Sequence, residues 1–192
     1  MKVIDCVKTV VNLIGDQDMG AVIEKIESGE ELVDSDTKIL KRYINGLNIA
    51  VDTIASRYYQ NIKTVRVVSD SEQRIPYEAL DERLYEVLEV VGPAGSKVEF
   101  YSLPFSVFVP KKLTQYTVKF KYLPKKASQI EDDVEVLPFV SERAIGYLMA
   151  SDIMLSRNLY DESKFWFNNF DSIMTQAVAT RRVRSLAFDK WL

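Results

Sequence analysis

The sequence contains no histidine. Histidine is the usual general base near neutral pH and a frequent zinc ligand, so its absence excludes a Ser-His-Asp triad and every zinc site that needs an imidazole. The single cysteine, Cys6, excludes an internal disulfide and any metal site built from several thiolates. Because Cys6 stands among valines, we expect a small buried side chain in a reducing compartment.

Glycine-rich phosphate loops and long hydrophobic runs are also missing. Gly15, Gly20 and Gly29 are isolated, and none precedes the Lys-Ser/Thr pair of a nucleotide-binding loop, so nucleotide hydrolysis is not expected. No segment approaches the roughly 20 apolar residues of a membrane span. Asp5 and Lys8 interrupt the first apolar stretch, which argues against a signal peptide. We expect a protein of the cytoplasm, or one assembled there.

Composition and charge indicate a folded chain with little attraction for nucleic acid. Hydrophobic residues make up 47% and charged residues 28%, as in ordinary globular domains. The formal net charge of -3 would repel a phosphate backbone. A length of 192 residues favours one domain, which we place at 1–180, followed by a C-terminal arm at 181–192.

Helical periodicity dominates the first third of the chain. Apolar residues spaced by three and four predict a helix over 3–14, a short helix over 21–26 and a long helix from Asp34 to Tyr58. Gly46 lies inside the long helix, where glycine costs on the order of 1 kcal/mol relative to alanine. We expect close helix packing at Gly46 to compensate for that cost.

The period changes to two between 62 and 122, which predicts an inserted antiparallel β region. The turn sequence Gly92-Pro93-Ala94-Gly95 predicts a hairpin between strands at 85–91 and 98–101. Residues 116–122 alternate without exception between apolar and polar side chains. This pattern predicts a strand whose apolar face packs on the helices and whose lysines face water.

Two helices are expected at the C-terminal end, at 144–155 and 161–178, joined at Asn158 in a left-handed conformation. The first is apolar nearly all round and is therefore expected to be central, with Gly146 and Ala150 allowing another helix close approach. The aromatic residues of the second helix are interpreted as core. They are Phe165, Trp166, Phe167 and Phe170. The predicted fold is α+β, a bundle of about four main helices with an inserted antiparallel sheet.

Two groups of residues are candidate contact sites. The long connection after Pro124 carries an acidic group, Glu131, Asp132, Asp133 and Glu135. It lacks the spacing of a calcium loop, so a solvated loop is favoured, with a subunit contact and a metal site as alternatives. A glycosidase would need two convergent acids, and spacing identifies no such pair. No cofactor site and no catalytic residue emerge.

The second group is the basic tail. It could be a nucleic-acid arm or a frayed terminus, but aromatic anchors with orienting arginines favour an arm that orders on a partner protein. The residues assigned to this arm are Arg181, Arg182, Arg184, Leu186, Phe188, Trp191 and Leu192.

The order of these elements resembles the head-tail connector (adaptor) proteins of tailed bacteriophages. The resemblance rests on two N-terminal helices, a β region ending in Val118-Lys119-Phe120-Lys121-Tyr122-Leu123-Pro124, an acidic loop to Leu137-Pro138, and the final helix pair. It implies a non-enzymatic subunit of a closed ring, commonly of about twelve copies. The ring would lie in the virion neck after assembly in the host cytoplasm.

The resemblance also implies partners. These are further copies of the chain, the portal protein, contacted by the C-terminal arm, and the next neck or tail protein. DNA would pass through the ring without specific binding, and no membrane or cofactor would be involved. Two alternatives remain open: another neck or tail-completion ring protein, and a soluble regulatory module that binds a small ligand. A catalytic function is the least favoured.

Overall fold

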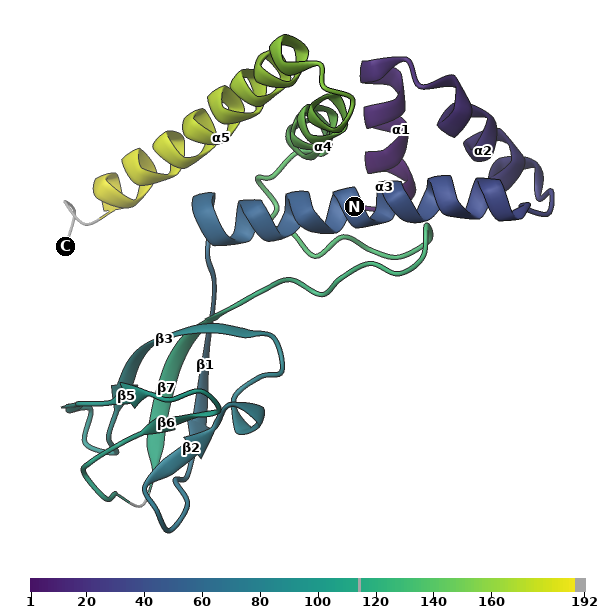
Figure 1. The fold of residues 1–192 in the computed structure, drawn as a ribbon. Coiled ribbons are helices and arrows are strands. Elements are labelled where there is room, and N and C mark those ends of the chain that lie inside the picture. Colours follow the sequence, from purple (N-terminus) through teal and green to yellow (C-terminus); the bar gives the residue numbers. More distant parts are fainter. Residues whose placement is uncertain (114, 189–192) are drawn as a thin grey trace. The chain divides into compact units, whose positions relative to one another are not determined.

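The computed structural model describes residues 1–113 and 115–188, with side chains through 179. The chain forms two compact units, shown in Figure 1. The helical unit comprises Met1–Ile54 and Lys125–Leu192, and the sheet unit comprises Ala55–Pro124. This is the predicted α+β class, with the sheet unit inserted between helices at boundaries slightly wider than the expected 62–122.

The described part of the helical unit contains five α-helices. They are α1 (Val3–Ile14), α2 (Gln17–Ser28), α3 (Asp34–Thr53), α4 (Glu142–Ser156) and α5 (Tyr160–Phe188), and a π-helical segment, Ile54–Tyr58, continues α3. Helix α1 has the predicted bounds. Helix α2 begins earlier than predicted because Asp16 caps it, accepting a hydrogen bond from the backbone amide of Met19 at 3.1 Å. Asn158 adopts the predicted left-handed conformation between α4 and α5.

Helix α4 is central, as predicted, because it packs against α1, α3 and α5. All of its residues from Ala144 to Ser151 are buried. Cys6 of α1 is fully buried in the same core. Its burial, together with the nearby carboxylates of Glu142 and Asp5, raises the pKa of the thiol to about 12. The thiol is therefore protonated at neutral pH and serves as a packing group.

Gly146 provides the close helix contact, whereas the expectation of close packing at Gly46 is wrong. A Cβ atom at Gly146 would lie 2.8 Å from Cγ2 of Thr9 and 3.2 Å from Cδ1 of Leu13, both on α1. A Cβ atom at Gly46 would meet nothing within 4 Å. The small residue that lets helices approach is therefore on α4, facing α1.

This difference predicts opposite effects of the same substitution. Gly146→Ala should lower the free energy of unfolding by about 1–2 kcal/mol, because Thr9 is β-branched and has little freedom to move aside. Gly46→Ala should raise it by about 0.5–1 kcal/mol through helix propensity alone. Urea denaturation of both variants checks the prediction, and a stabilised Gly146→Ala protein would show that the contact is not tight.

The sheet unit contains two antiparallel sheets. Its strands are β1 (Asn61–Val67), β2 (Arg74–Pro76), β3 (Leu84–Val91), β4 (Lys97–Val98), β5 (Tyr101–Ser102), β6 (Ser106–Phe108) and β7 (Tyr116–Tyr122), with a 3-10 turn at Tyr77–Ala79. One sheet has the strand order β1-β7-β3-β4 and the other β2-β6-β5. The hairpin predicted around Gly92 is confirmed by the pairing of β3 with β4. The strand predicted at 98–101 is split, because its two ends belong to different sheets.

The first and last strands of the sheet unit are neighbours. Asn61 at the start of β1 pairs with Tyr122 at the end of β7. The chain therefore enters and leaves the unit at one point on adjacent antiparallel strands. This pairing explains how about seventy residues can be inserted between two helices without breaking the helical unit.

The apolar face of β7 packs within its own unit, so the expectation that it would cover the helices is wrong. Tyr116, Val118 and Phe120 are fully buried in a cluster with Ile75 and Val107 of the second sheet. Two small sheets facing each other bury the alternating apolar side chains without help from a helix. Lys119, on the opposite face of β7, is exposed as predicted, whereas the side chain of Lys121 is only 14% exposed and forms an ion pair with Glu86.

Candidate partner-binding surfaces

The acidic loop is bound to the N-terminal end of α1. The backbone amide of Val3 donates to the carbonyl oxygen of Asp132 at 3.0 Å, and the amide of Ile4 donates to that of Ile130 at 3.1 Å. These amides begin a helix and have no intrahelical acceptor. The loop therefore has a structural role as a backbone cap for α1.

Asp132 and Asp133 both have side-chain partners within the chain. The Asp132 carboxylate accepts hydrogen bonds from the amides of Ser128 and Gln129 at 2.8 and 2.9 Å, and these bonds hold the pKa of Asp132 below its usual value. Asp133 forms an exposed ion pair with Lys2 at 3.0 Å. Asp132 thus shapes the loop, while Asp133 remains accessible from solvent.

The other two acids differ from each other. The Glu135 carboxylate accepts a hydrogen bond from the amide of Lys125 at 2.6 Å. Glu131 is exposed and forms no ion pair among the described residues. Glu131 and Asp133 are thus the members of the acidic group that a neighbouring subunit could reach, and that contact remains a prediction.

The predicted C-terminal arm falls mostly beyond what the structure describes. The backbone of α5 continues to Phe188, so Arg181, Arg182, Arg184, Leu186 and Phe188 belong to a helix, but their side chains lie outside the described set. Trp191 and Leu192 lie outside the described residues altogether. The arm therefore remains a prediction from the sequence.

A groove that the sequence did not indicate runs between α3 and α4. It has a volume of about 470 Å³ and is lined by Lys38, Lys41 and Ile49 of α3 and by Met149, Asp152 and Ile153 of α4. The side chain of Ile49 is 58% exposed. We name this feature the α3–α4 groove. It combines apolar side chains with two lysines that form no ion pair among the described residues.

Polar groups close and line this groove. Nη2 of Arg42 donates to Oγ of Ser156 at 2.9 Å, which links the two helices at one end. The Asp152 carboxyl is half-buried, and burial raises its pKa above the usual value. Since the described residues offer it no hydrogen bond or ion pair, Asp152 is a free acceptor for a cation brought by an occupant.

The N-terminal half of α5 presents a second surface, which corrects the interpretation of its aromatic residues. Phe170 is buried as expected and Trp166 is half-buried against Tyr147, with ring centroids 5.5 Å apart. Phe165 is 58% exposed, and Phe167 is also exposed. Helix α5 packs on α4 through one face only, so aromatic residues on its other faces have no core to enter.

Charged residues accompany Phe165. The side chains of Asp161, Glu162 and Lys164 are exposed and form no hydrogen bond or ion pair among the described residues. With Phe165 they form what we name the α5 ridge. The ridge complements the α3–α4 groove in charge: it offers an aromatic ring bordered mainly by acids, whereas the groove offers apolar side chains bordered by lysines.

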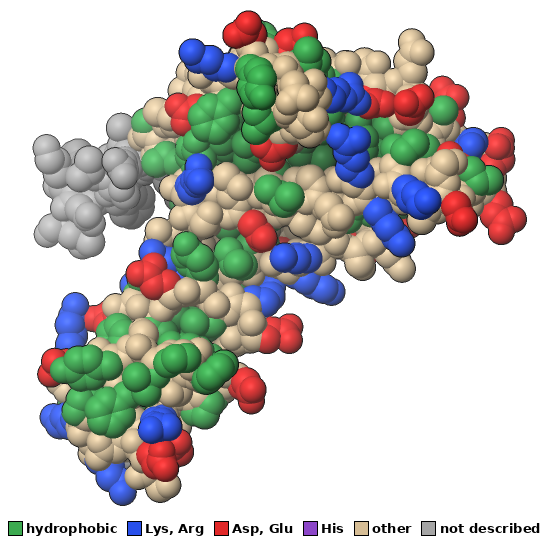
Figure 2. Space-filling model, viewed as in Figure 1, with side chains coloured by type: hydrophobic (Ala, Val, Ile, Leu, Met, Phe, Trp, Pro, Cys, Tyr) green, Lys and Arg blue, Asp and Glu red, His purple; other side chains and the backbone are tan. Residues whose placement is uncertain are grey.

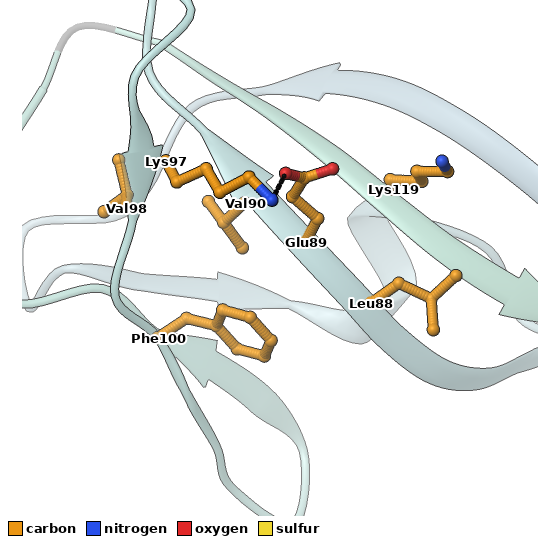
Figure 3. A pocket seen from close by; sticks show the side chains of 7 residues that line it. All are labelled: Leu88, Glu89, Val90, Lys97, Val98, Phe100 and Lys119. Atoms are coloured by element: carbon orange, nitrogen blue, oxygen red, sulfur yellow. Dashed lines mark ion pairs between the residues drawn. The ribbon is translucent and has the colours of Figure 1, made fainter.

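The sheet unit has a small pocket of its own, shown in Figure 3. It has a volume of about 240 Å³, and an ion pair between Lys97 and Glu89 at 2.9 Å lies beside the side chains of Val90 and Phe100. The ion pair holds the pKa of Glu89 below its usual value. Because its two charged groups already neutralise each other, the pocket offers an occupant little beyond a shallow apolar wall.

The tip of the β5–β6 hairpin carries an exposed phenylalanine. Phe105 is 86% exposed. The loop is held in place by Tyr77, whose hydroxyl donates to the carbonyl of Leu103 at 2.7 Å and whose amide donates to that of Phe105 at 3.2 Å. Figure 2 shows hydrophobic side chains gathered on the visible face of this unit. The phenyl ring of Phe105 is therefore held in an exposed position that a partner protein could cover.

The residues that build these surfaces could have been found from the sequence by one signal. Ile49 and Phe165 are large apolar residues that lie off the periodic stripe of their helices. A residue of this kind is expected either to cover a neighbouring element or to await a partner. From the sequence, Phe165 is assigned to the core together with Trp166, Phe167 and Phe170, and the predicted apolar stripe of the long helix does not include Ile49.

Neither the family models nor the curated proteins searched contain a match to this chain. Within the described part of the chain, no helix has both the length and the hydrophobicity that crossing a membrane requires. The Cys, Asp and Glu side chains of the described residues form no group of three that could hold a metal ion.

Proposed function

We propose that the chain is a non-enzymatic structural subunit of a bacteriophage neck, which forms a ring joining the portal vertex to the tail. The observation that carries this proposal is the exposure of large apolar side chains on both units. Tyr160 and Phe165 of the helical unit are 64% and 58% exposed, and Phe105 of the sheet unit is 86% exposed. Apolar surface of this kind is costly in water and favours a protein that is covered in an assembly.

The length of α5 supports a contact with a further partner. Helix α5 has 29 residues and α4 has 15, so at ~1.5 Å per residue they span about 43 and about 22 Å. Helix α4 can cover only half of its neighbour. The remaining half of α5 leads into the basic tail, which is where the resemblance to connector proteins places the portal contact.

The charge of the chain is compatible with passage of DNA. The net charge is -3, and a ring of such subunits would neutralise few phosphates. DNA would slide through it without being retained. The proposal accordingly includes no specific DNA site.

Co-sedimentation with portal rings from the same genome tests the proposal. The full chain should sediment with the portal, and electron microscopy should show an added ring on it. A chain lacking residues 181–192 should remain helical by circular dichroism but lose at least about tenfold in affinity, because a few anchor residues dominate such contacts. Normal binding of the truncated chain would contradict the arm, and failure of the full chain to bind the portal or to appear in virion necks would contradict the function.

One observation favours a second candidate, a regulatory module that binds a small ligand. The α3–α4 groove has a volume within the range of small-molecule sites and contains Asp152, a carboxyl that has no partner among the described residues. This alternative requires a monomer at high concentration and a ligand whose binding is lost in Asp152→Ala. A ring on the portal would rule it out as the main function.

A further inference from the structure

We propose that adjacent copies of the chain associate by seating the α5 ridge of one copy in the α3–α4 groove of the next. The inference rests on the proposed ring and specifies the contact that builds it. Each copy would contribute one groove and one ridge, and each would use both.

The two surfaces lie on opposite sides of α4. The groove is lined on one face of α4 by Met149, Asp152 and Ile153, which are spaced i, i+3 and i+4. Tyr147 and Ser151 lie on the other face and contact α5 through Trp166 and Ser163. The ridge is on the side of α5 turned away from α4. A single copy therefore cannot bring its own ridge to its own groove.

This placement determines the type of assembly. A contact between two different surfaces is heterologous, and repeated copies of it give either a closed ring or an open filament. A contact between two like surfaces would instead stop at a dimer. The arrangement of groove and ridge is therefore the one that a ring subunit requires.

The chemistry of the two surfaces is complementary. The groove offers Lys38 and Lys41 beside the exposed side chain of Ile49. The ridge offers Asp161 and Glu162 beside the exposed ring of Phe165. Apolar contact between Ile49 and Phe165 would remove both from water, while the flanking charges attract and set the register.

A second charge pair of opposite polarity adds to the match. Asp152 lies in the groove with no partner in the part of the chain that the structure describes, and Lys164 is next to Phe165 on the ridge. An occupant with acids alone would leave Asp152 uncompensated. The ridge supplies both acids and a cation, which is why a second copy of the chain fits the groove better than a purely acidic peptide.

Cysteine cross-linking tests the contact directly. Ile49→Cys places a thiol in the groove and Phe165→Cys places one on the ridge, and the buried Cys6 does not compete. When the two variants are mixed at high concentration, and again on portal rings, a short thiol cross-linker should yield mostly the mixed groove-ridge dimer. A molecule carrying both substitutions should give a ladder of higher oligomers. Glu24→Cys, on the exposed surface of α2, is the matched control.

Charge reversal provides the second arm of the test. Lys38→Glu with Lys41→Glu in the groove copy should lower the rate of mixed cross-linking at least about tenfold, because like charges are then opposed. Asp161→Lys with Glu162→Lys in the ridge copy should restore it. Three results would each overturn the proposal. The first is mixed cross-linking no faster than with the Glu24→Cys control, both in solution at high concentration and on portal rings. The others are a predominance of homodimers and a failure of Asp161→Lys with Glu162→Lys to restore the rate. If portal co-sedimentation persists in that case, the contact is wrong and the neck function stands.

Discussion

Asp16→Ala should lower the free energy of unfolding by about 2–3 kcal/mol, because one largely covered carboxylate joins three helices. Asp16 caps α2 through the amide of Met19. Its other oxygen accepts hydrogen bonds from the hydroxyl of Tyr43 on α3, at 3.0 Å, and from the guanidinium of Arg157 at the end of α4. Removal of the carboxylate leaves all three donors without their acceptor.

The same variant should change the response to acid. Burial alone would raise the pKa of Asp16, but the bonds from Met19, Arg157 and Tyr43 outweigh it and hold the pKa below its usual value. A carboxyl with a lowered folded-state pKa stabilises the protein above its unfolded-state pKa of about 3.9 and loses this contribution as the pH falls through the folded-state value. The stability difference between wild type and Asp16→Ala should therefore be full at neutral pH and shrink in acid.

Urea denaturation followed by circular dichroism at several pH values measures both effects. Asp18→Ala is the matched control, since Asp18 is exposed in the first turn of the same helix, and it should cost no more than about 0.5 kcal/mol. Asp16→Asn keeps a capping oxygen and should fall between the two. Equal losses for Asp16→Ala and Asp18→Ala, or a difference that does not change with pH, would show that the Asp16 carboxylate does not hold the three helices together.

Phe120→Ala should destabilise the sheet unit by about 3–5 kcal/mol, the usual cost of removing a buried aromatic ring. Phe120 is fully buried at the middle of β7, which pairs with β1 on one side and β3 on the other. Its ring lies between the two sheets, so its loss leaves a cavity lined by side chains of both. No other single truncation in β7 removes as much apolar volume without also removing a hydroxyl.

Hydrogen exchange read by mass spectrometry on peptides from β1, β3 and β7 measures this loss. Lys119→Ala provides the control, because it changes the neighbouring residue on the exposed face of the same strand and should shift stability by no more than about 0.5 kcal/mol. If the amides of these peptides are equally protected from exchange in both variants, the apolar face of β7 is not the core of the sheet unit.

Periodicity was sufficient to predict the elements that bury one continuous apolar face. The helix at 3–14 and the strand at 116–122 appear with the predicted bounds, because each buries a single continuous apolar face. Close approach at Gly146 was also predictable, since a small residue on an otherwise apolar helix is expected at a helix crossing. Local pattern indicates which face is buried.

Local pattern does not indicate what covers that face. The apolar side of β7 was expected to meet helices, yet the short strands β2, β5 and β6 supply its partner sheet. Strands of two or three residues carry too few alternations to be recognised. Likewise, residue type alone does not distinguish Phe170, which is buried, from Phe165, which is exposed and lies off the apolar stripe of its helix. The groove is formed by residues about a hundred positions apart in the sequence, so local patterns cannot predict it.

The insertion of the sheet unit has a consequence for biosynthesis. A ribosome releases α1, α2 and α3 long before α4, the helix against which α1 and α3 pack. The sheet residues, by contrast, are contiguous and are complete as soon as β7 emerges. We therefore expect the nascent chain to finish its inserted part first, while three amphipathic helices wait with their apolar faces uncovered and in need of protection by a chaperone.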